Sequence, residues 1–173
     1  MSVKPIFSLL ILTAAIPGAL LADWPQFRGP DGQGHSNATG IPVEWSDTKN
    51  VKWKMPVPGQ GYSSPVISGD QIWMTSAEKN GKSLHAICLD LATGNLLHNI
   101  EVITTNDAGP RHRLNGYASP TPVLDEEHVY VHFGPRGTVC LNRNGKIVWK
   151  NTEFKYNVIP VSYTHLTLPT NRE

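Results

Sequence analysis

The chain has 173 residues, which is enough for one ordinary domain with its own hydrophobic core. Its 15 Lys and Arg residues nearly balance its 14 Asp and Glu residues, and no basic block stands out. This pattern lacks the electrostatic footprint of a nucleic-acid-binding protein, so no nucleic-acid partner is expected. The 15 glycines and 14 prolines punctuate apolar runs, which is typical of a loop-rich all-β protein.

The first 22 residues have the pattern of a secretory signal peptide. Lys4 supplies a positive charge, and the apolar run IFSLLILTAAIPGALLA that follows ends in small residues at Ala22. The run is short for a membrane span and contains a Pro-Gly break. We therefore predict signal cleavage after Ala22, a periplasmic or secreted protein, and no membrane span in the mature chain. No Cys lies near the cleavage site to carry a lipid anchor.

Two segments follow the signal peptide. Residues 23–50 show no period and predict an irregular N-terminal arm anchored by Trp24 and Phe27. Val51–Met55 then has the pattern of the last strand of a repeat whose other strands are missing.

The stretch GYSSPVISGDQIWM, which starts at Gly61, recurs as GYASPTPVLDEEHVYV from Gly116. Aligning Pro65 with Pro122 matches the apolar residues of the two copies at a period of about 50–55 residues, within the range of repeat architectures. Alternating and β-branched runs predict four short strands per copy. The strands are expected at 64–68, 71–76, 84–90 and 95–102, and again at 121–125, 128–133, 138–142 and 146–154.

A Gly-containing turn joins the third and fourth strands of each copy. Asp90 and Asn142 can hydrogen-bond the turn backbone, and Gly94 and Gly145 can take positive φ. Four antiparallel strands joined by tight turns describe one blade of a β-propeller, and a blade needs neighbours to bury both of its faces.

We therefore predict an all-β fold, a β-propeller of four-stranded antiparallel blades. Residues 51–160 would form part of the ring, with blades at about 61–102 and 116–153, and Val51–Met55 would be the ring-closing strand, unpaired in this chain. The aromatic residues Trp73, Tyr130 and Trp149 are expected to fill the layers between blades.

The unit CLDLATGNLLH resembles the pyrroloquinoline-quinone (PQQ)-type propeller repeat, whose pattern is about Ala-Leu-Asp-x-x-Thr-Gly-x-x-x-Trp. The matching residues of the first copy are Cys88, Leu89, Asp90, Thr93 and Gly94. The second copy has Asn142 for Asp and lacks the Thr, but it keeps Gly145 and Trp149. The opening DWPQFRGPDGQG also resembles exported bacterial PQQ-like proteins. The resemblance covers Asp23 to about Pro160 and implies a fold more than an activity, since many such proteins carry the repeat without the quinone.

The only two cysteines, Cys88 and Cys140, fall at equivalent positions of the two copies. Facing sheets lie about 10 Å apart, which is beyond the reach of a disulfide. We therefore expect two buried free thiols.

The connector Thr104–Gly116 is long for a link between stacked sheets, and long loops are often functional. Arg111, His112 and Arg113 form a small cationic cluster beside Asn115. Such a cluster can bind a carboxylate, a sugar acid or an acidic protein face. These four residues are the candidate partner-facing loop; the reading that surface loops favour by default is an ordinary solvated connection.

The last 13 residues, VSYTHLTLPTNRE, do not continue the pattern. The run Val161–Thr170 resembles the translation of a transposase-type sequencing adaptor. We interpret residues 161–173 as an adaptor artefact and expect the natural chain to continue past Pro160, which makes this chain an N-terminal fragment. The alternative is a genuine final strand, since SYTHLTL alternates.

These features favour an exported binding or scaffold protein that presents loops at one rim of the propeller to a protein or glycan partner. No residue is assigned as catalytic, cofactor-binding or metal-binding. The resemblance implies an alternative, a PQQ- and calcium-dependent quinoprotein dehydrogenase acting on alcohols or sugars. A second alternative is an envelope-assembly scaffold, whose lipid-anchored form would need a Cys after the signal.

Overall fold

The computed structural model describes residues 23–110 and 115–153. The signal peptide predicted at 1–22 and the adaptor-like tail predicted at 161–173 lie outside the described residues. Regular structure in the described ranges is β, apart from one short 3-10 turn, η1 (Gly134–Arg136). A search of these ranges for a helix long and apolar enough to cross a membrane finds none.

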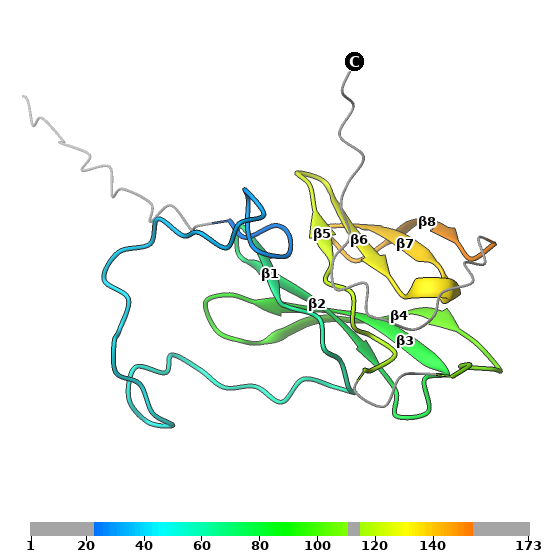
Figure 1. The fold of residues 1–173 in the computed structure, drawn as a ribbon, viewed down its shortest axis with the longest axis horizontal. Coiled ribbons are helices and arrows are strands. Elements are labelled where there is room, and N and C mark those ends of the chain that lie inside the picture. Colours follow the sequence, from blue (N-terminus) through cyan, green and yellow to red (C-terminus); the bar gives the residue numbers. More distant parts are fainter. Residues whose placement is uncertain (1–22, 111–114, 154–173) are drawn as a thin grey trace, which may run out of the picture.

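Eight strands form two antiparallel four-stranded sheets, each in sequence order (Figure 1). The first sheet contains β1 (Val66–Ser68), β2 (Gln71–Ala77), β3 (Ser83–Asp90) and β4 (Leu96–Thr104). The second contains β5 (Val123–Leu124), β6 (His128–His132), β7 (Thr138–Asn142) and β8 (Ile147–Asn151). The all-β class and the eight strands predicted from alternation are therefore confirmed. The described sheets do not close into a ring, so the propeller stays a prediction.

The tight turns between the last two strands of each sheet form as predicted. The Asp90 carboxylate accepts hydrogen bonds from the amide and the hydroxyl of Thr93, at 2.7 and 2.6 Å. In the second sheet the Asn142 side-chain oxygen accepts from two turn amides. Gly94 and Gly145 have φ of 74° and 80°, a backbone region that favours glycine. These local contacts set where β4 and β8 begin.

The two sheets share one hydrophobic core. Because side chains alternate along a strand, one face of each sheet supplies that core. The largest buried side chains that the sheets contribute to it are Trp73, Leu84, Ile103, Leu124 and Leu141. Trp73 is fully buried and its Nε1 donates to the side-chain oxygen of Gln71 at 2.9 Å. Its predicted position between two sheets is confirmed.

The opposite face of the first sheet is covered by the segment that was expected to close the ring. Val51–Met55 forms no strand in the structure. Trp53 and Met55 instead pack against a small cluster centred on buried Ile87, and Trp53 Nε1 donates to the Leu91 carbonyl at 3.1 Å. The segment therefore lies across a sheet face, and its pairing as a ring-closing strand stays a prediction.

The N-terminal arm is tied to both sheets near its start. Trp24 exchanges two backbone hydrogen bonds with Ile67 of β1, at 2.7 and 2.9 Å. The next carbonyl, from Pro25, accepts from the Leu124 amide of β5 at 2.8 Å. Trp24 thus anchors the arm as expected, and Phe27 is half-buried beside it. Residues 35–50 are exposed.

Strand register shows that the second sheet repeats the first. One row across the first sheet reads Val66, Trp73, Cys88, His98. The matching row across the second reads Val123, Tyr130, Cys140, Trp149. The first row faces the second sheet, whereas Tyr130 and Trp149 lie on the side of the second sheet turned away from the first. Trp149 is 44% exposed, and the burial of this pair between blades stays a prediction.

Both cysteines are free and buried, as predicted. Each thiol donates weakly to the carbonyl of the following leucine, at 3.9 Å. Burial raises the pKa of Cys88 to about 12, and it also raises the pKa of Cys140. The two side chains are therefore neutral thiols that fill space in their sheets.

Candidate binding cleft

The connector between the two sheets was the site predicted from sequence. Arg111, His112 and Arg113 lie outside the described residues, so the cationic cluster stays a prediction. Asn115 is described and half-buried, and it comes one residue before a cleft that the sequence did not indicate.

The start of the connector is held against the first sheet. The Thr105 amide donates to the Lys82 carbonyl at 2.9 Å, which continues the pairing at the end of β4. Asp107 then closes a turn, because its carboxylate accepts from the Gly109 amide at 2.8 Å. Tyr117, beyond the connector, donates its hydroxyl proton to the Gly109 carbonyl at 3.4 Å. The Tyr117 side chain therefore contacts the middle of the connector.

Arg136 of η1 packs against the ring of Tyr117. Its guanidinium carbon lies 4.9 Å from the centre of the Tyr117 ring, within cation–π range. Burial lowers the pKa of Arg136, although Tyr117 and Asp107 nearby favour its charged form. Its Nε is buried and has no hydrogen-bond partner within the described part of the chain. The arginine thus acts as a stacked support for the Tyr117 ring.

A cleft of about 700 Å³ opens beside Tyr117. Three segments line it: 57–63, which precede β1; 74–78, which end β2; and Gly116 with Tyr117, which precede β5. The cleft therefore lies where the two copies of the Gly-Tyr repeat come together, at the end of β2. Volumes of this size are typical of small-ligand sites.

Glycines allow the lining segments to approach one another. A Cβ on Gly59 would lie 2.4 Å from the Ser76 hydroxyl, and one on Gly61 would lie 2.5 Å from the Thr75 carbonyl oxygen. A Cβ on Gly116 would lie 2.8 Å from the ring of Tyr62. Side chains at these positions would push the segments apart, so the shape of the cleft depends on them.

Several backbone amides along the cleft are paired within the protein. Gln60 and Ala77 exchange two hydrogen bonds of 2.8 Å, and the Tyr62 amide donates to the Ala118 carbonyl at 2.8 Å. The Thr75 amide donates to the Ser63 hydroxyl at 3.0 Å. These bonds hold the lining segments together.

Sequence reasoning identified the repeated Gly-Tyr but not the cleft. It treated the repeat as a source of mutual burial, and Tyr117 is indeed half-buried. Tyr62, however, is 64% exposed and lines the cleft. The signal that could have found it is the exposed aromatic at a glycine-flanked loop, and only the meeting of the two copies gives that aromatic a site.

The structure also brings together a serine and a histidine that the sequence reading did not pair. The Ser83 hydroxyl lies 2.7 Å from Nε2 of His85, and Nδ1 of His85 lies 2.8 Å from the Asn99 side-chain oxygen. Ser83 donates its only hydroxyl proton to the Glu101 carboxylate. The Ser83 hydroxyl proton is therefore already bound by a carboxylate. The cluster fixes the edge of the sheet.

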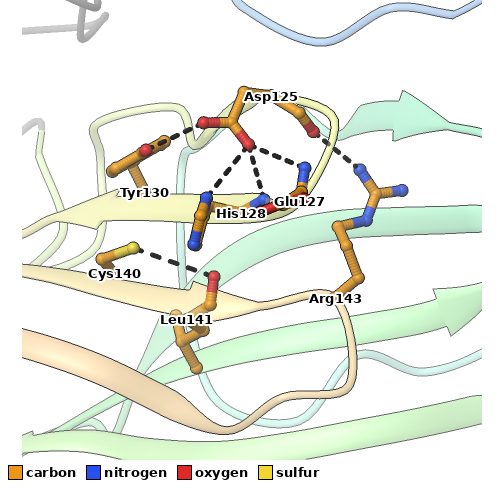
Figure 2. Close-up of polar contacts among 7 residues, drawn as sticks. All are labelled: Asp125, Glu127, His128, Tyr130, Cys140, Leu141 and Arg143. Atoms are coloured by element: carbon orange, nitrogen blue, oxygen red, sulfur yellow. Dashed lines mark hydrogen bonds and ion pairs between the residues drawn. The ribbon is translucent and has the colours of Figure 1, made fainter.

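A second polar cluster surrounds Asp125 in the turn between β5 and β6. Figure 2 shows its carboxylate accepting from the amides of Glu127 and His128, at 2.9 and 2.6 Å, and from the Tyr130 hydroxyl at 2.8 Å. Burial opposes ionisation, but these hydrogen bonds outweigh it and lower the pKa of Asp125. Burial and the bond to Asp125 raise the pKa of Tyr130 to about 12. The donors bind the charged carboxylate, so its role is to hold the turn.

Replacing Tyr130 with Phe should reveal this role through its pH dependence. A lowered carboxyl pKa stabilises the fold at pH values above the unfolded pKa of about 4, and this stabilisation disappears as the pH falls through the folded pKa. Because the carboxylate is partly exposed, we expect the variant to lose about 1 kcal/mol of unfolding free energy at pH 7. The loss should shrink at pH 3. Urea unfolding at both pH values measures it.

The control for this variant is Tyr62→Phe, which removes a hydroxyl from an exposed ring in the cleft. It should change stability at neither pH. An equal loss for Tyr130→Phe at both pH values would show that the hydroxyl does not act through the Asp125 charge.

No group of three or more His, Cys, Asp or Glu side chains gathers within residues 23–110 and 115–153. We therefore assign no residue to calcium or PQQ. No protein-family model matches the chain, and a comparison with curated proteins finds no match.

Proposed function

We propose that this protein is an exported β-propeller that works as a binding or scaffold protein and presents one rim to a protein or glycan partner. The observation that carries the proposal is the shared register of the two sheets. Trp73 and Tyr130 occupy equivalent positions, as do Cys88 and Cys140, so the same four-stranded unit occurs twice. In each unit this face is turned toward the side on which the next unit of the chain would stack.

Repeated stacking of this kind favours a ring. When every copy covers the same face of the copy before it, the contacts are head-to-tail, and they close if the rotation per copy allows. The Trp73 face of the first sheet is covered by the second sheet. A third sheet placed in the same way would cover Tyr130 and Trp149. This geometry supports a propeller with further blades.

The rim at the Gly-Tyr end is the partner-binding surface in this proposal. The cleft opens there, and in the sequence Arg111, His112 and Arg113 come shortly before its lining residue Gly116. Loops placed by a rigid scaffold carry binding residues more often than the scaffold itself. The cationic residue types of the connector suit acidic groups on a partner, and the polar cleft suits hydroxyl groups.

Capture of a partner from a cell-envelope extract tests the proposal. The full-length protein should recover a defined partner, and Arg111→Glu with Arg113→Glu should reduce recovery by at least about tenfold, because two charge-assisted contacts become repulsive. The matched control, Lys146→Glu with Lys150→Glu, makes the same change in net charge in the second sheet, and its recovery should match that of the unmodified protein.

Equal recovery by both double variants would contradict a role for the connector. Titration with PQQ and calcium gives an independent check on the whole proposal. A visible absorbance change together with reduction of an artificial dye in the presence of alcohols or sugars would replace the binding role with a dehydrogenase.

A further inference from the structure

We infer that the cleft beside Tyr62 and Tyr117 binds a neutral saccharide chain. This inference rests on the proposed binding function and names the ligand class. It follows from two properties of the described lining, namely an exposed aromatic face and polar side chains without cations.

The aromatic face is supplied by Tyr62. Its side chain is 64% exposed, yet one side of the ring lies against Gly116, so closely that a Cβ there would come within 2.8 Å of a ring carbon. The ring is thus held in place without being covered. A tyrosine ring presents a rigid amphipathic surface at low entropic cost, and the C–H face of a pyranose is a matching apolar surface.

Two polar side chains, Gln60 and Glu78, are exposed in the same lining. A carboxylate accepts hydrogen bonds from hydroxyl groups strongly, and an amide both donates and accepts. This set matches the hydroxyl groups along the edge of a sugar ring, each of which donates one hydrogen bond and can accept two.

The same lining disfavours an anionic ligand. Its described residues include one carboxylate, Glu78, and no Lys, Arg or His, so an anionic ligand would meet the wrong charge there. A neutral ligand that binds through side chains fits this lining.

Isothermal titration calorimetry of the full-length protein tests the inference. The probes are cellohexaose, maltohexaose and chitohexaose, with trigalacturonate as the anionic comparison. At least one neutral hexasaccharide should bind, and trigalacturonate should bind at least about tenfold more weakly. Tyr62→Ala should weaken binding by about tenfold or more, since stacking on an aromatic ring is worth roughly that factor. Tyr62→Phe keeps the ring and should stay within about threefold.

Trp45→Ala is the matched control, because Trp45 is 74% exposed and lies on the N-terminal arm outside the cleft lining. It should leave the dissociation constant unchanged. All three variants should melt at the temperature of the unmodified protein, since both positions are exposed, so a change in affinity reports on the cleft.

Two results would overturn the inference. One is the absence of binding of all three neutral hexasaccharides at about 10 mM, a concentration at which even weak sites fill. The other is a Tyr62→Ala variant that binds like the unmodified protein. If either occurs while the envelope partner is still captured through Arg111 and Arg113, the saccharide assignment fails and the proposed binding function stands.

Discussion

Replacing Trp73 with alanine should lower the free energy of unfolding by about 3–5 kcal/mol. The side chain is 0% exposed and packs in the core that joins the two sheets. Its removal leaves a cavity and also deprives the Gln71 side-chain oxygen of the indole donor. A loss of this size is a large part of the stability of an ordinary domain, so the variant should be largely unfolded in mild urea. Urea titration followed by circular dichroism measures the change.

Trp149→Ala is the control for size and residue type. Trp149 is 44% exposed on the face of the second sheet turned away from the first, so in this 173-residue chain its replacement should cost only about 1 kcal/mol. In a longer chain with a third sheet over that face, the cost should rise toward the value for Trp73. Equal, small losses for both tryptophans would show that the sheets do not share a core.

Replacing Arg143 with alanine should cost about 2–4 kcal/mol, the second largest effect we expect. Arg143 lies in the turn between β7 and β8, and its guanidinium donates to three acceptors outside that turn. The bonds are to the Ser68 carbonyl at 2.7 Å, the Gln71 side-chain oxygen at 3.1 Å and the Asp125 carbonyl at 3.3 Å. Two of these acceptors belong to the first sheet, so the side chain fastens one sheet to the other.

The conservative variant Arg143→Lys makes this prediction sharper. An ammonium group is a compact charge that cannot cover three separated acceptors as a planar guanidinium does. We therefore expect Arg143→Lys to lose more than half of what Arg143→Ala loses in urea unfolding. Lys146→Ala, a change in the same turn, should have little effect. If Arg143→Lys is as stable as the unmodified chain, charge alone matters and the three-point contact does not.

The three hydrogen bonds of the Arg143 guanidinium could not be predicted from the sequence. In the alignment of the two copies, Arg143 corresponds to Leu91, and nothing in the pattern of the turn marks it as different from a solvated arginine. Its partners at Ser68 and Gln71 are more than 70 residues away along the chain. Only the stacking of one sheet on another brings them within hydrogen-bond distance.

Part of the candidate site could be predicted from the sequence, and part could not. The repeated Gly-Tyr and the long connector were visible in the sequence, because both are local patterns. The cleft was not, since it needs Tyr62 from the first copy and Gly116 from the second to meet. The placement of Val51–Met55 was missed for a related reason. Its alternation is typical of a strand. In the structure, however, Trp53 packs on an apolar sheet face and donates to a backbone carbonyl, and the segment pairs with no strand.

What the sequence determined by itself is the all-β class, the eight strands and the two glycine turns at Gly94 and Gly145. Each depends on interactions between residues a few positions apart, whose preferences a linear pattern records. The tertiary structure alone decided that Trp73 is covered while Trp149 is exposed, that Arg143 joins the sheets, and that a cleft forms where the two copies meet. Those outcomes depend on which sheet faces pack together, and side-chain alternation supplies two candidate faces per sheet without choosing the partner of either.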